Sequence, residues 1–555
     1  MLEGCVPWPE ELAASYRQKG YWEDITLGQM LDARIAETPD AEVLVSGDER
    51  LTYAGLGRRI DRLAYRLHEA GLKPLDRVVL QLGNGIDFVL AFFALVRIGV
   101  IPVMALPPHR RTEIRHFVAR SGAVGYVVPD RVKDFDYRDM ADEVRKEYPR
   151  LGHVFVSGEA GPGQTSLADL LAAPADAEAV RTTLARLSPD PAEVALMLLS
   201  GGTTALPKLI PRTHNDYVCN CKLSGRLAGF SPKTVFLAVL PMGHNFTLAS
   251  PGILAIFAYG GKVVVAPGPR AADVFPVIER ERVTATATAV PLVATWLEAP
   301  ERGQYDLSSL RLIQSGGARL PPELRRRVRA RFGCVYQEVY GTAEGLLNMT
   351  RLNDPDEIIE QSSGAPVCED DEIKVVDDAG NEVPDGTPGE LVTRGPYTIR
   401  GYYDNPEAND KGFTDDGFYR MGDVVRKIGR YVYTEGRKKD LVNRGGEKIS
   451  CDEVEDHILA HPKVRNVCVV AMPDEIFGEK ACAYAILAEG ETLSLKELCD
   501  FLLKREIAKF KLPERLEIVD AFPISPAGKI LRRDLRERIE AKIAEERGAA
   551  SAARS

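Results

Sequence analysis

A segment of small and hydroxyl residues that ends in a lysine carries the clearest chemical signal in the sequence. Residues 200–208 read Ser-Gly-Gly-Thr-Thr-Ala-Leu-Pro-Lys and follow an apolar run at 194–199 that predicts a strand. Small residues let backbone N–H groups approach phosphate oxygens, hydroxyls add donors, and Lys208 adds positive charge. The segment is not a Walker A loop, because Pro-Lys-Leu stands where that pattern has Gly-Lys-Ser or Gly-Lys-Thr. A glycine-rich turn alone is often structural, but this combination indicates a phosphate-binding loop.

Two later motifs place a carboxylate beside glycine. Residues 339–345 read Val-Tyr-Gly-Thr-Ala-Glu-Gly, in which Tyr340 could stack on a flat ring and Glu344 could hold a Mg²⁺ that bridges phosphate oxygens. Residues 417–423 end in Gly-Asp, and Asp423 suits two vicinal ribose hydroxyls. Taken singly, a solvated glutamate and an Asx-turn aspartate are the more ordinary interpretations.

Two charged motifs lie near the C-terminus. Residues 435–440 (EGRKKD) and 443–448 (NRGGEK) form a dense charge run with a Gly-Gly pair, which is typical of a solvated linker between domains. Residues 526–530 read Pro-Ala-Gly-Lys-Ile and place Lys529 in a loop. A lone loop lysine is exposed to solvent in most proteins, so neither motif decides a function by itself.

The elements that must position these motifs alternate between helix and strand over residues 50–340. Leu51-Thr52-Tyr53 leads into a helix that is predicted to run through about Gly71, and strands are predicted at 77–82, 124–129, 194–199, 235–240, 262–266, 284–289 and 312–314. This alternation favours an α/β fold with mainly parallel sheets covered by helices. The apolar run 88–106 is nearly long enough to span a bilayer, but Arg97, Gly99 and Pro102 interrupt it. A buried helix, a turn and a buried strand explain it better.

The character of the chain changes after about residue 365. Short strands at 372–376, 389–393 and 431–434 indicate a β-rich subdomain. A small α+β unit follows from about 440, with a helix after Asp452, strands at 467–471, 481–486 and 516–519, and a helix at 495–504. We expect an N-terminal core at 1–438, a C-terminal domain at 439–540, and a disordered tail at 541–555.

Composition limits the class of protein. The chain has 555 residues and a net charge of −10, so we expect at least two domains and no nucleic-acid partner. The nine cysteines are scattered and odd in number, which indicates reduced thiols rather than disulfides or a zinc site. The N-terminus has no signal-peptide pattern. We therefore expect a cytoplasmic protein without a membrane segment.

The five motifs, in this order, resemble those of the adenylate-forming superfamily, which includes acyl-CoA synthetases, luciferases and peptide-synthetase adenylation domains. The resemblance covers roughly residues 20–540. It implies a large N-terminal domain and a small C-terminal domain that turns about Lys439 and Asp440 between two half-reactions, with ATP and Mg²⁺ as cosubstrate and cofactor.

A narrower resemblance is to stand-alone aryl acid–AMP ligases, among them the salicylate and 2,3-dihydroxybenzoate ligases of siderophore biosynthesis. It lies in residues 8–11 (WPEE), 20–22 (GYW), 105–107 (ALP), 109–110 (HR), 210–217 (IPRTHNDY), 241–245 (PMGHN) and 393–403 (TRGPYTIRGYY). It implies adenylation of an aryl acid and transfer to the phosphopantetheine thiol of a separate aryl carrier protein, because this chain has no carrier-like segment.

The resemblance also implies roles for individual residues. Lys529, His244 and Lys208 would be catalytic, and Glu344 would bind the metal. The ATP-binding set would be Ser200, Gly201, Gly202, Thr203, Thr204, Lys208, Gly316, Gly317, Ala318, Tyr340, Gly341, Thr342, Glu344, Asp423 and Arg437. The aryl acid would be bound by His244, Asn245, Phe246, Ser250, Gly317, Ala343 and Leu347.

Departures from the family pattern and conflicting markers leave questions open. Ala205 replaces a glycine or serine of the phosphate loop, and Met421 replaces a threonine. By the resemblance, Ser250 favours 2,3-dihydroxybenzoate. Leu347 favours salicylate, because leucine has one methylene more than the valine that dihydroxybenzoate ligases tend to have, and this methylene fills space that a ring substituent needs. We predict salicylate first. The alternatives are an aryl- or acyl-CoA ligase and a non-catalytic adenylate-binding scaffold. The presence of all four residues Lys208, Glu344, Asp423 and Lys529 argues against the scaffold.

Overall fold

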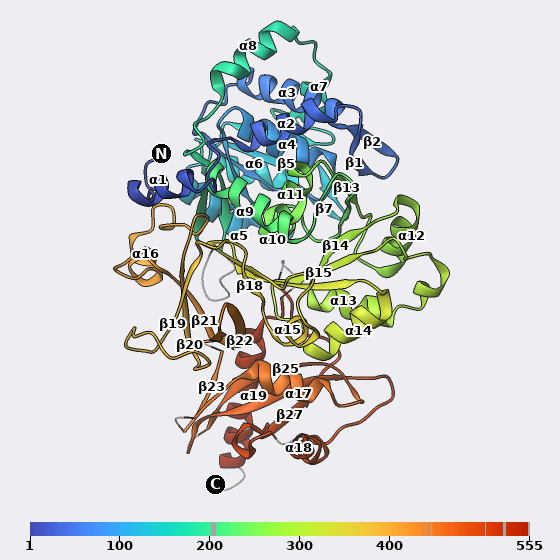
Figure 1. The fold of residues 1–555 in the computed structure, drawn as a ribbon, viewed down its shortest axis with the longest axis vertical. Helices are drawn as coiled ribbons and strands as arrows, with labels where there is room; N and C mark the ends of the chain where they lie inside the picture. The colour runs from blue at the N-terminus through green and yellow to red at the C-terminus, as the bar shows by residue number, and fades with distance from the viewer. Residues whose placement is uncertain are drawn as a thin grey trace.

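The chain divides into a large N-terminal part and a smaller C-terminal part at one end of the molecule (Figure 1). The computed structural model describes residues 1–200, 207–438, 440–445, 447–474, 476–505, 507–525 and 529–552. The expected α/β fold, with helix-covered sheets followed by a β-rich subdomain and a small α+β part, is confirmed.

Two largely parallel sheets form the core of the N-terminal part. Within the described residues, one sheet has the order β18-β17-β16-β15-β14-β12-β13-β1-β2 and the other β11-β10-β4-β3-β5-β8-β9. The strands of the first are β1 (Glu42–Ser46), β2 (Glu49–Thr52), β12 (Val235–Ala238), β13 (Lys262–Val265), β14 (Ala285–Thr288), β15 (Leu312–Gly316), β16 (Val335–Thr342), β17 (Gly345–Met349) and β18 (Ala365–Pro366). Those of the second are β3 (Arg77–Leu80), β4 (Ile101–Met104), β5 (Gly125–Pro129), β8 (His153–Ser157), β9 (Thr165–Ser166), β10 (Val194–Leu199) and β11 (Leu209–Thr213). A small hairpin, β6 (Arg131–Val132) and β7 (Phe135–Asp136), lies beside the second sheet.

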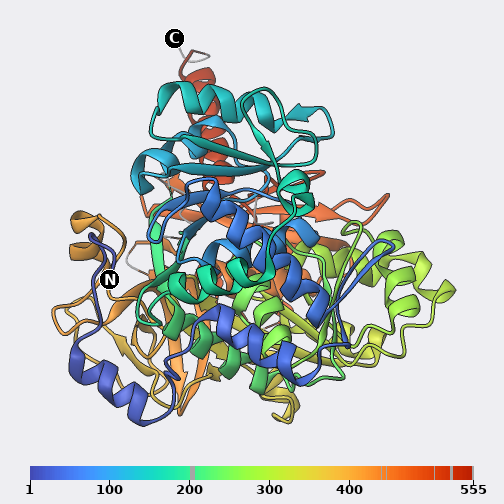
Figure 2. The same ribbon diagram turned by 90° about the horizontal axis from the view of Figure 1, so that it is seen from above.

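Helices cover these sheets, as Figure 2 shows for the blue to green segments. They are α1 (Glu10–Gln18), α2 (Leu27–Glu37), α3 (Tyr53–Glu69), α4 (Ile86–Arg97), α5 (Arg111–Ser121), α6 (Tyr137–Glu147), α7 (Leu167–Ala172), α8 (Ala177–Leu187), α9 (His214–Leu227), α10 (Asn245–Ala249), α11 (Gly252–Ala258), α12 (Ala271–Glu281), α13 (Val290–Glu298), α14 (Pro322–Phe332) and α15 (Asp356–Gln361), with a 3₁₀ turn at Pro300–Gln304. The apolar run 88–106 is the buried helix α4, a turn at Gly99 and the buried strand β4, as predicted. Over the part of the chain that the structure describes, no helix is long and apolar enough to cross a membrane.

The β-rich subdomain is an antiparallel sheet of β19 (Glu372–Val376), β20 (Gly389–Arg394), β21 (Tyr419–Ile428) and β22 (Tyr431–Arg437), with α16 (Pro406–Gly412) beside it. Strand β21 alternates buried and partly exposed residues, so Tyr419, Met421 and Asp423 share its buried face. The departure at Met421 therefore places an apolar side chain on the same face as Asp423.

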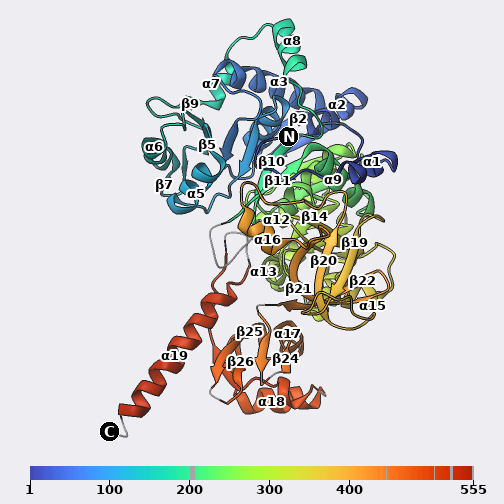
Figure 3. The same ribbon diagram turned by 90° about the vertical axis from the view of Figure 1, so that its left-hand side faces the viewer.

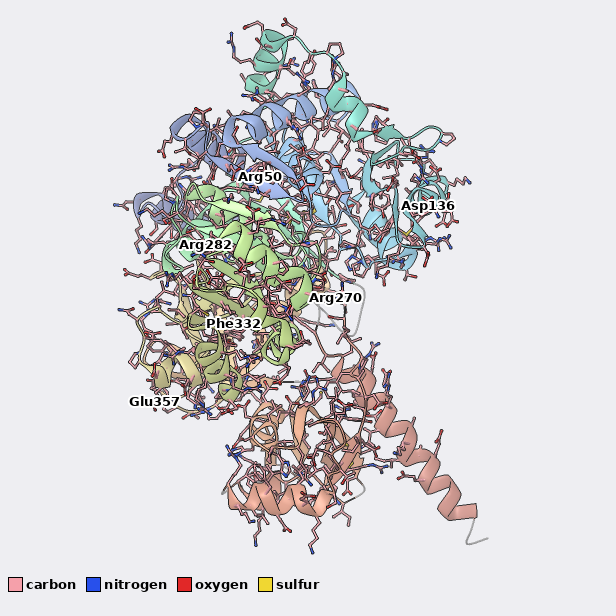
Figure 4. All side chains as sticks on the ribbon, turned by 90° about the vertical axis from the view of Figure 1, so that its right-hand side faces the viewer. Arg50, Asp136, Arg270, Arg282, Phe332 and Glu357 are labelled. Carbon is pink, nitrogen blue, oxygen red and sulfur yellow. The ribbon has the colours of Figure 1, made fainter. Side chains whose placement is uncertain are left out.

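The C-terminal part is a mixed sheet of β23 (Val442–Arg444), β24 (Glu447–Ile449), β25 (Val464–Asp474), β26 (Gly478–Leu487) and β27 (Arg515–Ile518). Helices α17 (Cys451–Leu459), α18 (Leu495–Lys504) and α19 (Arg532–Ala552) pack on it, with a 3₁₀ turn at Lys509–Lys511. Figure 3 shows α19 extending away from this sheet. Figure 4 shows Arg50 and Asp136 far from the C-terminal part, and Glu357 of α15 at the end of the N-terminal part that faces it.

The predicted tail at 541–555 overlaps helix α19, which continues through Ala552. Glutamate, alanine, arginine and lysine dominate this segment, and all four favour helix. Glu546 also pairs with Arg515 of β27 at 2.6 Å, which ties the extended helix to the sheet.

Candidate active site

The two ends of the predicted phosphate loop are joined by two hydrogen bonds, one between backbone groups and one to a side chain. Ser200 donates its N–H to the Lys208 carbonyl (3.0 Å), and Lys208 donates its N–H to Ser200 Oγ (2.9 Å). Both residues stand where the antiparallel strands β10 and β11 end. Gly201, Gly202, Thr203, Thr204 and Ala205 lie outside the described residues. Ser200 and Lys208 thus hold the two ends of the loop together, and Lys208 places a cation there.

Lys208 and Glu344 converge on Tyr402. The Lys208 ammonium lies 3.9 Å from the centroid of the Tyr402 ring, and the Tyr402 hydroxyl donates to Glu344 Oε1 at 2.9 Å. Burial lowers the pKa of Lys208, and the charge of Glu344 opposes that effect. The arrangement places a cation and a buried carboxylate beside the mouth of the loop.

A magnesium ion fits this carboxylate only with help from a substrate. Among the described residues, no cluster of three or more His, Cys, Asp or Glu side chains could hold a metal by itself. Mg²⁺ keeps several waters and is usually bound by one or two carboxylates together with substrate phosphates. Glu344 is 6% exposed and lies near the Lys208 cation, so its chemistry suits a metal that arrives with a polyphosphate.

Asp423, Arg437 and Tyr340 form a second polar group. Asp423 of β21 lies opposite Arg437 of β22; Arg437 Nε is 3.1 Å from Asp423 Oδ1, and the Tyr340 hydroxyl donates to Oδ2 at 2.7 Å. Burial raises the pKa of Asp423, while Arg437 and Tyr340 oppose the rise. A carboxylate held at both oxygens by the protein is well oriented to accept further hydroxyl donors.

Two glycines at the end of β15 make a flat surface. A Cβ on Gly316 would lie 3.0 Å from both the Phe246 ring and the Val339 carbonyl oxygen, so a side chain there would collide. Gly317 has φ +84°, a left-handed conformation that glycine adopts without strain. Ala318 follows, so the backbone is exposed to close approach by a ring.

Lys529 reaches this surface from the C-terminal part. Its Cε would lie 3.4 Å from a Cβ on Gly317, so its stem passes directly over that glycine. Burial and the charge of Arg437 lower the pKa of Lys529 to about 8, against the opposing charges of Asp423 and Glu344. Its backbone is fixed by exchange of hydrogen bonds with Ser525 (3.1 and 2.7 Å). Lys529, which as a lone loop lysine would ordinarily be exposed, is therefore half-buried among the other predicted site residues.

His244 and Asn245 begin a short helix beside the same region. His244 caps α10, its Nδ1 accepting the Phe246 N–H at 3.3 Å, and burial together with Lys529 lowers its pKa to about 4. The imidazole is therefore neutral at neutral pH. Asn245 accepts from the Tyr217 hydroxyl (2.8 Å) and donates to Ser250 Oγ (3.2 Å).

Leu347, Gly341 and Ala343 belong to the hairpin of β16 and β17. Leu347 lies opposite Gly341 in register, and its Cδ1 is 3.1 Å from where a Gly341 Cβ would be. Leu347 is 4% exposed. Thr342 sits at the turn, and the Ala343 carbonyl accepts from Arg212 at 2.8 Å.

Three residues without a predicted role support these groups, and two of them, Arg212 and Tyr217, lie in the 210–217 motif. Arg212 is buried, pairs with Asp216 at 2.8 Å, and binds the Ala343 and Tyr397 carbonyls. Tyr217 and Asn220, three apart on one face of α9, bind Asn245 and Ser250. The helical spacing of Tyr217 and Asn220 was a usable signal, whereas the long-range partners of Arg212 left none.

The predicted hinge is partly described. Lys439 lies outside the described residues. Asp440 donates its N–H to the Arg437 carbonyl at 2.8 Å, and its own carbonyl accepts from Cys451 Sγ at 3.1 Å. Asp440 thus joins the end of β22 to the first residue of α17.

Two protein-family models match the chain. The model described as "AMP-binding enzyme" matches residues 31–403, and that described as "AMP-binding enzyme C-terminal domain" matches residues 453–529. This chain belongs to the AMP-binding enzyme family. It is an ATP-dependent ligase with Mg²⁺ as cofactor, of the aryl acid–AMP ligase branch.

Curated relatives and solved structures cover nearly the whole enzyme. It is 45% identical to "2,3-dihydroxybenzoate-AMP ligase" of Bacillus subtilis, over 98% of this chain and 99% of that protein. It is 44% identical to "Salicyl-AMP ligase / salicyl-S-ArCP synthetase" of Mycobacterium tuberculosis, over 96% and 94%. The apo structure of Mycobacterium smegmatis MbtA matches with a TM-score of 0.74 and 41% identity, over 96% and 98%. The recognition from sequence of an aryl acid–AMP ligase is therefore confirmed.

Proposed function

We propose that this enzyme converts a 2-hydroxy aryl acid, salicylate before 2,3-dihydroxybenzoate, into its adenylate. It then passes the acyl group to the phosphopantetheine thiol of a separate aryl carrier protein in siderophore-type peptide biosynthesis. The observation that carries the proposal is the meeting of Lys529, the Asp423–Arg437 pair and the neutral His244 at the Gly316–Gly317 surface. The names of the relatives support the acid and the carrier.

In the proposed first step, a carboxylate oxygen of the aryl acid attacks the α-phosphorus of ATP. A bond forms between that oxygen and phosphorus, the bond from phosphorus to the bridging oxygen of the β-phosphate breaks, and pyrophosphate leaves with the electron pair. No proton is transferred. The protein positions the groups and stabilises charge. The Lys529 ammonium would lie beside the negative charge that develops around the α-phosphorus. His244 is neutral, so it would not add a positive charge that stabilises the carboxylate before it attacks.

The proposed nucleotide site is built from the polar groups around Lys208, Glu344, Asp423 and Lys529. The loop between Ser200 and Lys208 would surround the β- and γ-phosphates, and Gly316, Gly317 and Ala318 would lie under adenine with Tyr340 nearby. Asp423 and Arg437 would hold the ribose. Glu344 would hold Mg²⁺, which when bound would neutralise phosphate charge.

The proposed acid site lies around α10. His244 and Asn245 would face the carboxylate and the ortho-hydroxyl, and Phe246, Ser250, Gly317, Ala343 and Leu347 would enclose the ring. The Tyr217–Asn245–Ser250 chain of hydrogen bonds would fix the amide so that one orientation meets the acid.

The proposed domains are residues 1–438 and 439–540, with the hinge at Lys439 and Asp440. The second half-reaction would follow a turn of the C-terminal domain that withdraws Lys529 and admits the thiol. The thiol sulfur then forms a bond to the acyl carbon, AMP leaves, and the thiol proton goes to solvent. We also propose a reducing compartment such as the cytoplasm, because all nine cysteines are described and are free thiols.

A pyrophosphate–ATP exchange assay with a panel of aryl acids tests the proposal. Exchange that depends on salicylate or 2,3-dihydroxybenzoate is expected. Absence of exchange with every acid would favour the scaffold alternative. Comparing acyl transfer to holo-carrier protein and to coenzyme A distinguishes the carrier reaction from an aryl-CoA ligase, for which faster transfer to coenzyme A would be the sign.

A further inference from the structure

An ion pair crosses to the C-terminal part from residue 319, directly after Gly316, Gly317 and Ala318, which form the proposed surface under adenine (the adenine floor). Arg319, two residues after Gly317, pairs with Asp456 of α17. The side chains are 15% and 21% exposed, so solvent screens the pair weakly. Gly317 is also the residue over which the Lys529 stem passes. The ion pair and Lys529 therefore both contact the N-terminal part within the short segment 317–319.

The same helix anchors the segment that carries Lys529. Arg532, three residues after Lys529, pairs with Asp452 (2.6 Å) and Glu455 (2.5 Å) and donates to the Val469 carbonyl (2.7 Å). Asp452, Glu455 and Asp456 stand at i, i+3 and i+4 on α17, so they are neighbours on the helix surface. Two of these acids hold the lysine segment, and the third holds the N-terminal part.

The Arg319–Asp456 pair lies beside open space. Both residues line a cleft of about 640 Å³ between α14, β22 and α17. On the cleft side, the contact between the two parts is not filled by apolar packing. The ion pair there therefore contributes more to the orientation of α17 than it would in a fully packed contact. Because the pair joins the two parts, any turn of the C-terminal part must break it.

We propose that Arg319 and Asp456, with Arg532, form a clamp that orients Lys529 for adenylate formation. These are positioning residues, since none belongs to the residues proposed to bind ATP or the aryl acid. Arg319 fixes α17 to the adenine floor, and Asp452 and Glu455 transmit that position through Arg532 to Lys529. The inference rests on the proposed role of Lys529 in the first half-reaction.

The test uses charge reversal and its repair in the full-length enzyme. Pyrophosphate–ATP exchange with salicylate is measured for Asp456→Arg, Arg319→Asp and the double exchange of the two charges. We expect each single variant to lose at least about tenfold in kcat with little change in KM for ATP, because a broken partly buried pair leaves an unpaired charge. The double variant should recover at least about fivefold over either single variant.

Glu546→Arg is the matched control. It reverses a carboxylate that pairs with Arg515 inside the C-terminal part, so its exchange rate should stay within about twofold of the parent. If Asp456→Arg does not fold, Asp456→Asn replaces it, with an expected loss of at least about threefold.

Further outcomes separate failure of the clamp from failure of the proposed function or of the role of Lys529. Near-parental exchange in the Asp456 variant, or a double variant no better than the singles, overturns the clamp. Absence of exchange in the parent enzyme overturns the proposed function, and full exchange in Lys529→Ala overturns the role of that lysine.

Discussion

The stem of Lys529 lies directly over Gly317, 212 residues earlier in the chain, with 3.4 Å between Cε and the position of a Gly317 Cβ. The lysine comes from the C-terminal part and the glycine from the end of β15. Since the two parts meet at this point, their relative position decides whether the lysine faces the nucleotide site. The first two predictions depend on this contact.

Lys529→Ala should lower pyrophosphate–ATP exchange by about 10²–10³-fold, because one charge that stabilises the transition state is lost. Thiol transfer from preformed adenylate should keep its rate, since the lysine would be withdrawn by then. Lys542→Ala is the control. Lys542 is an exposed lysine of α19 that pairs with Glu517 of β27. Equal losses in both half-reactions would contradict a domain turn.

The pH dependence of exchange should report the Lys529 ammonium. Its pKa in the free enzyme is lowered to about 8, so the charged form is present below that pH and is lost as pH rises through it. We expect kcat/KM for ATP to fall above pH 8, because this parameter follows ionisation of the free enzyme. His244, with its pKa lowered to about 4, contributes no change near neutrality.

Lys529→Arg provides the check on that assignment. Arginine stays protonated throughout the range, so the fall near pH 8 should disappear even if the variant is slower. A fall that persists in Lys529→Arg would assign the ionisation to another group.

Asp423→Ala should raise KM for ATP more than KM for the aryl acid. The carboxylate is held by Arg437 and Tyr340, and losing a charged acceptor for ribose should cost about 1.5–3 kcal/mol, roughly 10–150-fold. Asp416→Ala, at an exposed turn near the start of β21, is the control. An unchanged KM for ATP would remove Asp423 from the nucleotide site.

Sequence alone predicted many of the core strands but few of the helices, because the hydrophobic period and turn residues that mark the strands are local signals. Strand β10, strand β19 and helix α18 match the predicted ranges to the residue. The helix α19 was not predicted, because small and charged residues favour both disorder and helix, and the Arg515–Glu546 contact that ties the helix to the sheet is not local.

The site was predictable where motifs lie within one loop, as at Ser200 and Lys208. Partners far apart in sequence were not. Tyr402 reaches Glu344 across 58 residues, and Arg319 reaches Asp456 across 137. Nothing in the sequence of α17 distinguished Asp456, which reaches the N-terminal part, from Asp452 and Glu455, which pair with Arg532.

The choice between salicylate and 2,3-dihydroxybenzoate should depend on Leu347. Leu347 lies opposite Gly341, and its Cδ1 is 3.1 Å from the position of a Gly341 Cβ, so the leucine side chain packs against this glycine. Leu347→Val removes one methylene there, which in such a pocket is worth about 1–3 kcal/mol, or 10–200-fold. The ratio of kcat/KM for the two acids should therefore shift toward 2,3-dihydroxybenzoate.

Leu346→Val is a matched control for this change. It removes the same methylene from the next residue of β17, whose side chain points to the opposite face of the sheet and is also buried. A general loosening of the hairpin would alter both variants alike, whereas a pocket effect belongs to Leu347 alone. If the ratio is unchanged in Leu347→Val, the leucine lies outside the acid site, and Ser250, held by Asn245 and Asn220, becomes the better guide to the preferred acid.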